Sequence, residues 1–133
     1  LNFEGKKIPL KKIIEMQIKK TGKLFSFCCM APAVVSKNNK YLNMLGKIGL
    51  DIGLLFQIAD DLIDYSGNTK KVGKKTKKDL KKGKATLISL LGHQNTIKYG
   101  NNLKFKIFKK LNVFGKRSND LKNTIKFILE RQM

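Results

Sequence analysis

The fold of this chain is decided by the stretch Gly49-Leu50-Asp51-Ile52-Gly53-Leu54-Leu55-Phe56-Gln57-Ile58-Ala59-Asp60-Asp61-Leu62-Ile63-Asp64-Tyr65. This apolar run is long enough for a helix, yet three of the chain's nine acidic residues crowd into positions 60–64. On a helix, Asp60 and Asp64 lie one turn apart on one face, with Asp61 beside them and Gln57 one turn before. Like charges at this spacing oppose helix formation by about 0.2–0.5 kcal/mol per pair. The cluster therefore predicts a neutralising partner outside the helix, and a divalent cation is the natural candidate.

The aspartates admit two interpretations. Oxygen ligands without histidine or cysteine suit a hard cation such as Mg²⁺, which shares its coordination shell with water and substrate phosphates. The opposite face of the same helix carries Leu54, Leu55, Ile58 and Leu62, so the aspartates are expected to face a cleft or solvent. A solvated acidic face on an amphipathic helix fits the short pattern equally well, and spacing alone leaves both open.

Helical periodicity extends to the N-terminal side of this stretch. Apolar residues at three-and-four spacing after Pro9 predict a first helix over 10–30. Ala31-Pro32 is expected to interrupt it, and residues 36–39 to form a turn. A second helix is expected over 40–65, with Gly46, Gly49 and Gly53 as a ridge for close helix packing and Ser66-Gly67-Asn68 as its C-terminal stop.

The C-terminal side is also predicted to be helical. One helix is expected from Asp79 to about residue 91, a second over 94–111, and a third over 118–132 with Ser118 and Asn119 as candidate N-caps. No segment alternates with period two. The predicted class is all-α.

The composition sets limits on class and charge. A chain of 133 residues with 41% apolar content forms one domain at most and is not a disordered polycation. The net charge of +20 raises a nucleic-acid hypothesis, since lysine and arginine neutralise phosphates. However, Arg117 and Arg131 are the only arginines, whereas nucleic-acid readers favour arginine forks. Abundant Lys, Asn and Ile fit an AT-rich genome, to which we assign most of the charge.

Few other residues offer chemistry. Adjacent Cys28 and Cys29 cannot normally bridge each other and match no zinc spacing, so we expect two small buried thiols in a reducing cytoplasm. His93 has no second histidine or nucleophile nearby, so a surface or structural residue is expected. No apolar run approaches the roughly 20 residues of a membrane span, so we expect no stable membrane anchoring. Without an initiator methionine or a signal pattern, the sequence is expected to begin in mid-protein.

Lysines beside glycines follow the aspartate cluster. Gly73-Lys74 and Gly83-Lys84 lie ten positions apart with Asp79 between them, and Lys20-Thr21-Gly22 lies in the first predicted helix. A carboxylate-bound metal flanked by mobile lysines is what a diphosphate leaving group requires, because both stabilise the charge that develops as the carbon–oxygen bond breaks. The alternative is that these lysines belong to a solvated loop and a helix end. The residues alone do not decide between the two.

In order and spacing these segments resemble the C-terminal half of a trans-prenyl diphosphate synthase, closest to bacterial farnesyl diphosphate synthase (geranyltranstransferase). The segments that carry the resemblance are Lys20-Thr21-Gly22, 53–64, Gly67, Gly73-Lys74, Asp79-Leu80, 83–87 and 127–131. Lys77 stands where the family often has glycine, and Ile88 where proline often follows the Thr-Leu pair. The family fold is a bundle of long helices around a deep cavity. Residues 1–133 would then form a single partial domain, the C-terminal half of that bundle.

The resemblance implies roles at the diphosphate. Asp60, Asp61 and Asp64 would be the second aspartate-rich motif, holding Mg²⁺ against the allylic diphosphate, with Asp60 the most direct ligand. The same diphosphate would be contacted by three lysines, namely Lys20, Lys74 and Lys84.

Further roles are implied around the reacting carbons. Thr21 and Gln57 would lie near the allylic carbons and steady the cation. Phe56 would lie near isopentenyl diphosphate, and Asp79 would support the loop that closes over the site. The basic tail with Arg131 would fold back to the mouth of the cavity and bind diphosphate.

The implied reaction is a head-to-tail condensation. Mg²⁺-assisted ionisation of dimethylallyl or geranyl diphosphate gives an allylic carbocation, isopentenyl diphosphate attacks it, and loss of a proton gives farnesyl diphosphate. The family's first aspartate-rich motif and upstream basic segment are not in this sequence, so we expect half of the metal site and no turnover from these residues alone. A full-length homodimer in the cytoplasm is expected.

Three alternatives stay open. Residues beside the absent first motif set product length, so a geranylgeranyl or longer-chain synthase is one. A basic helical nucleic-acid-binding module and a non-catalytic partner of an active synthase are the others. The aspartates count against both, since a phosphate-binding surface or a scaffold has no need of them.

Overall fold

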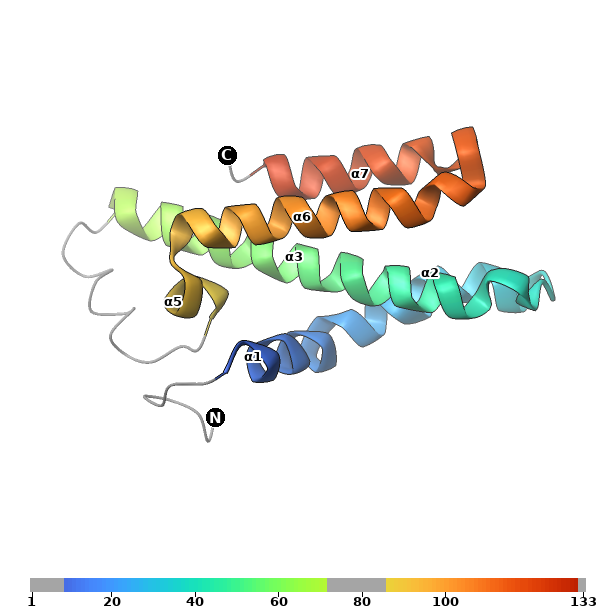
Figure 1. Cartoon of the computed structure of the whole chain (residues 1–133), viewed down its shortest axis with the longest axis horizontal. Coiled ribbons are helices and arrows are strands. Elements are labelled where there is room, and N and C mark those ends of the chain that lie inside the picture. The colour runs from blue at the N-terminus through green and yellow to red at the C-terminus, as the bar shows by residue number, and fades with distance from the viewer. Residues whose placement is uncertain (1–8, 72–85, 132–133) are drawn as a thin grey trace.

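The chain folds as a helical bundle (Figure 1). The computed structural model describes residues 9–71 and 86–131, apart from the side chains of 68–71, and no strand occurs in them. The predicted all-α class is confirmed. In chain order the elements are α1 (Leu10–Gln17), the π-helical turn η1 (Ile18–Gly22), α2 (Lys23–Val35), the 3₁₀ turn η2 (Asn39–Tyr41), α3 (Leu42–Lys71), α5 (Leu87–Leu91), α6 (His93–Leu111), the 3₁₀ segment η3 (Asn112–Ser118) and α7 (Asn119–Glu130).

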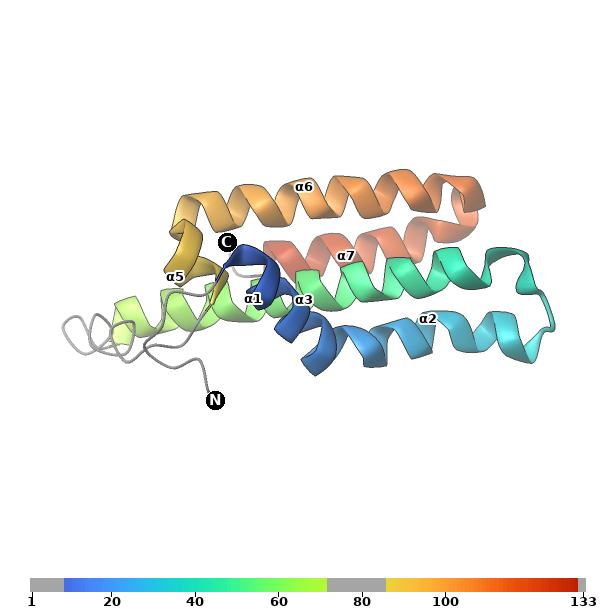
Figure 2. The ribbon, with the colours of Figure 1, turned by 60° about the horizontal axis from the view of Figure 1, so that its bottom comes forward.

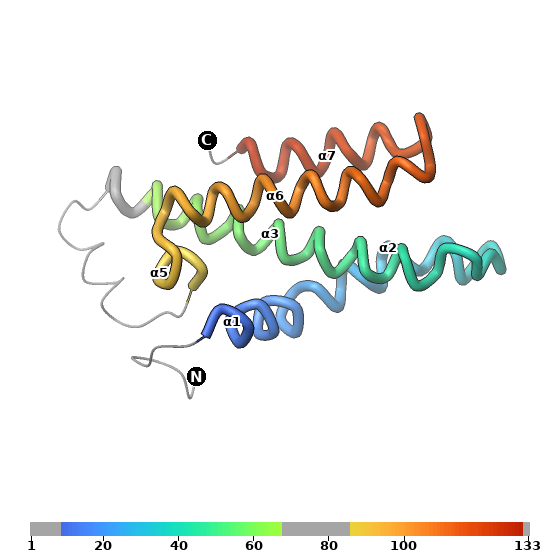
Figure 3. Tube along the Cα trace, in the orientation of Figure 1, coloured from blue at the N-terminus to red at the C-terminus, as the bar shows by residue number. Residues whose placement is uncertain are grey.

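Helix α3 is the central element, and it contacts each of the other described helices. Helices α1 and α2, joined through η1, run along one side of it, and α6 and α7 form a hairpin along the other (Figure 2). The turn between α2 and α3 and the turn between α6 and α7 lie at the same end of the bundle (Figure 3). The decisive apolar stretch is therefore sandwiched between two helical pairs, which explains its composition.

The glycine ridge of α3 packs against α2 as predicted. A Cβ atom on Gly49 would lie 2.5 Å from Cα of Ser26, and one on Gly53 would lie 2.6 Å from Cα of Gly22. A Cβ on Gly46 would lie 2.9 Å from Sδ of Met30. No side chain fits at the two closest positions, so glycine is what allows the helices to approach this closely.

The core lies along the opposite face of α3. Leu54, Leu55, Ile58 and Leu62 are at most 4% exposed, which confirms the predicted buried face. They join buried aliphatic residues of α1, α5, α6 and α7, among them Ile13, Leu87, Ile107, Leu111, Ile125 and Leu129. With this face buried, the adjoining face of α3 is left for the aspartates.

Two predicted helix ends are wrong. Helix α2 continues past Ala31-Pro32 to Val35. Pro32 lacks one backbone N–H donor, but it lies in the last turn of the helix, so the loss is confined to that turn. The actual end is set at Lys37, whose φ of 56° turns the chain while Asn38 N donates to the carbonyl of Ala33. Helix α3 continues past Ser66-Gly67-Asn68 to Lys71, because glycine in a helix costs only about 1 kcal/mol relative to alanine.

The helices of the C-terminal half follow the prediction more closely. Helices α6 and α7 begin and end within two residues of the predicted bounds. Of the helix predicted from Asp79, residues 79–85 lie outside the described part of the chain, and α5 begins at Leu87 behind a reciprocal cap between Thr86 and Ser89. Ser118 occupies the N-cap position of α7, but its Oγ donates to the carbonyl of Gly115 at 2.7 Å, so the predicted capping role is wrong.

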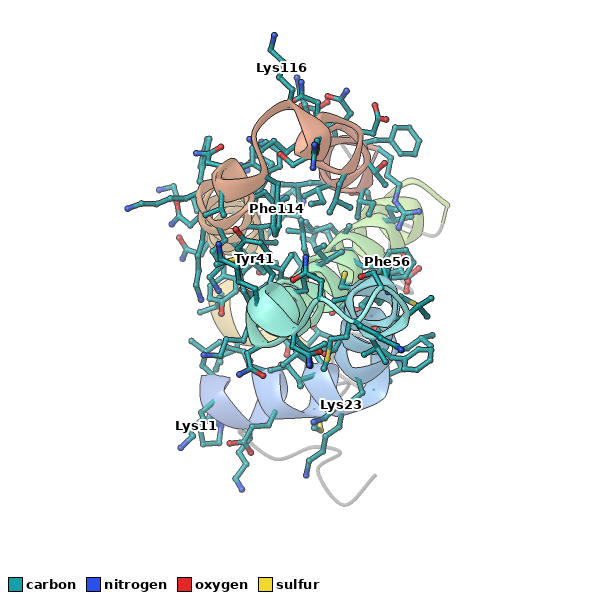
Figure 4. The ribbon with its side chains drawn as sticks, turned by 90° about the vertical axis from the view of Figure 1, so that its right-hand side faces the viewer. Lys11, Lys23, Tyr41, Phe56, Phe114 and Lys116 are labelled. Carbon is teal, nitrogen blue, oxygen red and sulfur yellow. The ribbon has the colours of Figure 1, made fainter. Side chains whose placement is uncertain are left out.

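The two turns at one end of the bundle are joined by an aromatic contact. Tyr41 and Phe114 pack edge to face with their ring centroids 5.0 Å apart, as the end-on view shows (Figure 4). In the same view Lys11, Lys23 and Lys116 point away from the bundle. The contact fixes the α2–α3 pair to the α6–α7 pair.

Several minor predictions are also tested. His93 stacks on Tyr65 with the ring centroids 5.0 Å apart, in agreement with a structural role. Both cysteines are free. Cys28 is exposed because it lies on the outward face of α2, so the expectation of two buried thiols is wrong. Cys29 is half-buried. Its burial is the main cause that raises the pKa of its thiol, and the neighbouring Cys28 raises it further.

One helix of the described residues is long and apolar enough to cross a membrane by length and composition. It covers Asn39–Gly67, and 56% of its most apolar window is buried inside the bundle. The core helix of a globular protein meets the same criterion.

Candidate functional site

A line of polar side chains joins η1 to the aspartate face of α3. Thr21 Oγ1 donates to Oε1 of Gln57 at 3.1 Å, and hydrogen bonding by Gln57, one turn before Asp61, lowers the pKa of the Asp61 carboxyl. Gln57 is only 8% exposed, so this line passes through the interior of the bundle. The π-helical turn supplies the Thr21 end, and such turns are frequent at functional sites.

Asp61 is the most perturbed group of the cluster. Burial, the largest effect, raises the pKa of its carboxyl to about 6, and the negative charges of Asp64 and Asp60 act in the same direction. The hydrogen bond from Gln57 and the positive charge of Lys20 oppose the rise. Its Oδ2 is buried and has no hydrogen-bond partner within residues 9–71 and 86–131. A buried carboxylate oxygen without a donor is ready to accept a cation or a proton.

Asp60 has a different partner. Arg131, directly after α7, donates from Nη2 to Oδ1 of Asp60 at 3.0 Å, and its guanidinium lies over the ring of Phe56 at 5.1 Å. Phe56 also contacts Phe25 of α2, with the ring centroids 5.5 Å apart. The end of α7 is thereby held on the aspartate face of α3.

The structure brings together most of the predicted site residues. Aspartates 60, 61 and 64, Gln57 and Phe56 come from α3, Lys20 and Thr21 from η1, and Arg131 from the end of α7. Lys74, Asp79 and Lys84 lie outside the described residues. Within the described part of the chain, no three His, Cys, Asp or Glu side chains converge closely enough to hold a metal ion. A magnesium ion held by one or two carboxylates, with water and phosphate oxygens completing its shell, is compatible with this arrangement.

Sequence reasoning missed three features of the site. The π-helical form of η1 has no signature in the sequence. Gln17, directly before η1, is 7% exposed, and its buried Oε1 has no partner among the described residues; only its place in the helical periodicity marked it. Asp51 lies on the same helix as the cluster but belongs to the scaffold, because its Oδ2 pairs with Nζ of Lys110 at 3.2 Å and of Lys106 at 3.9 Å.

Known proteins are similar to this chain over most of its length. The chain is 30% identical over 129 residues to the farnesyl diphosphate synthase of Micrococcus luteus. The matched residues cover 96% of this chain and 44% of that protein. It is 36% identical over 100 residues to the geranylgeranyl diphosphate synthase of Cyanophora paradoxa, covering 74% of this chain and 33% of that protein. The chain thus spans less than half the length of these relatives.

A solved structure shares the fold. The crystal structure of a geranyltransferase from Helicobacter pylori matches with a TM-score of 0.71 at 24% identity, covering 98% of this chain and 42% of that one. The family profile described as polyprenyl synthetase matches residues 2–127, nearly the whole chain. The chain therefore belongs to the polyprenyl synthetase family.

Proposed function

We propose that this chain supplies the allylic-diphosphate half of a prenyltransferase site that joins isopentenyl diphosphate head to tail to an allylic diphosphate. The observation that carries the proposal is the polar line from Thr21 through Gln57 to Asp61, which ends in three carboxylates on one face of α3. A site that generates a carbocation needs charge to be held and water to be excluded more than it needs a nucleophile.

The carboxylates fit a magnesium ion. The donor set is all oxygen, and Asp61 presents a buried oxygen that has no donor among the residues that the structure describes. When bound, Mg²⁺ would neutralise the diphosphate and assist its departure as a leaving group. Asp60 and Asp64 lie beside Asp61 on the helix, so one or two of these three carboxylates can coordinate a hydrated ion directly while the rest contact it through water.

The neighbouring residues have matching tasks. Lys20, whose charge already acts on Asp61, can bind a diphosphate oxygen, and Lys74 and Lys84 are proposed to do the same. The hydroxyl oxygen of Thr21 keeps lone pairs free to face the developing cation, because its proton is donated to Gln57. Phe56 presents an aromatic face that can also stabilise positive charge.

Farnesyl diphosphate is the proposed product, and this is supported by the farnesyl diphosphate synthase of Micrococcus luteus among the relatives. A geranylgeranyl product is the second candidate, favoured by the relative from Cyanophora paradoxa. We propose further that the complete protein is a cytoplasmic homodimer without stable membrane anchoring.

Binding of Mg²⁺ with inorganic pyrophosphate, measured by isothermal titration calorimetry, tests the proposal. Asp60→Asn and Asp61→Asn should weaken this binding about 10- to 100-fold, as expected when a charge-assisted contact is lost. Asp51→Asn is the matched control, since it removes an aspartate from the same helix outside the cluster, and it should leave binding unchanged. Equal affinity in all four proteins would refute the assignment.

Turnover provides a second test. In a full-length protein that carries this chain, Mg²⁺ should support formation of farnesyl diphosphate from isopentenyl and geranyl diphosphates, and Asp60→Ala should lower the rate by orders of magnitude. Near-normal turnover of that variant would contradict the role of the cluster. Analysis of the product by chromatography distinguishes a farnesyl from a geranylgeranyl synthase.

A further inference from the structure

The end of α7 makes three contacts through one side chain. Arg131 donates from Nη2 to Oδ1 of Asp60 at 3.0 Å, covers the ring of Phe56 at 5.1 Å, and donates from Nε to the carbonyl of Ile128 at 3.3 Å. The bond to Ile128 fixes the side chain against its own helix, while the other two contacts cross to α3. The guanidinium is therefore placed on the aspartate cluster by contacts from two helices.

This position is one that a divalent cation would need. Oδ1 of Asp60 accepts the guanidinium N–H, and a metal ion coordinated by the same oxygen would bring two positive centres into contact. Among the described residues, Asp60 is the one member of the cluster with a basic nitrogen within 4.0 Å. Asp61 keeps a buried oxygen that has no hydrogen-bond donor among the described residues, so the two neighbouring carboxylates differ: within this part of the chain Asp60 has an ion-pair partner and Asp61 has none.

We propose that Arg131 is the resident cation of Asp60, and that a divalent cation binding there must displace it and release the end of α7 from α3. The proposal rests on the proposed function, because it assumes that the aspartate cluster binds a metal ion. Arg131 acts here as a positioning residue. While Arg131 is paired with Asp60 its Nη2 is engaged, and displacement would free that group to bind a diphosphate.

The competition between Arg131 and a divalent cation for Asp60 should change the cation affinity only modestly. An exposed ion pair and an exposed cation–π contact are both weak, so removing Arg131 should tighten cation binding about three- to tenfold. Two variants serve as controls. Arg131→Lys keeps a charge without the planar fork and should fall between the wild type and Arg131→Gln. Lys126→Gln removes one positive charge from the same helix, where Lys126 faces Glu130 at 3.9 Å, and it should bind the cation as the wild type does.

The experiment uses Mn²⁺ alone as the probe, without diphosphate. Electron paramagnetic resonance of the free ion gives its affinity for the wild type, Arg131→Gln, Arg131→Lys, Lys126→Gln and Asp60→Asn. Hydrogen exchange of the last turn of α7 is followed in the same samples, after circular dichroism has shown that each variant is folded. We expect the tightest binding in Arg131→Gln, intermediate binding in Arg131→Lys, weaker binding than the wild type in Asp60→Asn, and Mn²⁺-induced loss of protection in the wild type that is already present in Arg131→Gln.

The possible failures are distinct. If the wild type binds Mn²⁺ through Asp60 but Arg131→Gln binds no more tightly, or the protection of α7 does not change, the displacement is wrong and the metal site stands. If Lys126→Gln tightens binding as much as Arg131→Gln, the effect is one of net charge and the proposal is overturned. If no protein binds Mn²⁺, both the displacement and the proposed metal site are overturned.

Discussion

Replacing Gly53 with alanine should disturb both the packing of α3 and the polar line of the site. The new Cβ would lie 2.6 Å from Cα of Gly22, the residue after Thr21, and an ordinary contact begins at 3.4 Å. Because the obstacle is backbone, the helices must separate locally by about 0.8 Å. Gln57 lies one turn beyond Gly53, so the same movement stretches the Thr21–Gln57 hydrogen bond from 3.1 Å to about 3.9 Å, beyond the range of a hydrogen bond.

The expected loss of stability follows from two opposing effects. Overpacking against backbone should cost about 3 kcal/mol, and the better helix propensity of alanine should return about 1 kcal/mol. The net loss of about 2 kcal/mol corresponds to a Tm about 8 °C lower for a domain of this size. Gly67→Ala is the matched control on the same helix, because nothing lies within 4 Å of its Cβ. It should gain stability from propensity alone.

Thermal unfolding followed by circular dichroism measures both variants. A double-mutant cycle with Thr21→Val then tests the hydrogen bond, since Thr21→Val should cost stability in the wild type and almost none in Gly53→Ala, where the bond is already lost. An unchanged or raised Tm in Gly53→Ala would refute the packing argument. An equal cost of Thr21→Val in both backgrounds would refute the proposed stretching of the bond.

Two further variants probe charge and turn. The pKa of Asp61 is raised from 3.8 to about 6, so the folded state binds its proton more tightly than the unfolded state does, and stability should fall by about 1–3 kcal/mol as pH rises from 4 to 6. Urea denaturation across this range should show that fall in the wild type, and a wild-type slope in Asp61→Asn would contradict the assignment. Ser118 is buried at the start of α7, and Ser118→Ala removes its bond to Gly115, so it should lower the free energy of unfolding by about 1 kcal/mol; a change in Tm of zero would exclude that role.

The sequence was informative where periodicity and side-chain type decide the structure. The buried face of α3 and its glycine ridge could be predicted, because leucines and glycines at helical spacing have few alternatives to burial and close packing. The contact between Thr21 and Gln57 was expected only as a shared neighbourhood from the family resemblance, and the structure gives it a distance.

Other features depend on tertiary contacts that no local pattern encodes. Gly67 resembles a helix stop, but continued helix costs little there, and α3 runs on to Lys71. Cys28 was expected to be buried from its residue type, whereas burial depends on which face of α2 turns inward. The pairing of Arg131 with Asp60 joins residues 71 positions apart, and no spacing rule predicts it.

The contact between Tyr41 and Phe114 has a consequence for how the two helical pairs can move relative to each other. It fastens the two helical pairs at one end, and Asp60 lies about 28 Å along α3 from that end, at 1.5 Å per residue. If the pairs rotate about this contact by about 2°, the distance between them at the level of Asp60 changes by about 1 Å. A movement of this size would have to be taken up by the core residues Ile58 and Leu62, which lie at the same level of α3 as Asp60, while the distant contact between Tyr41 and Phe114 would stay as it is.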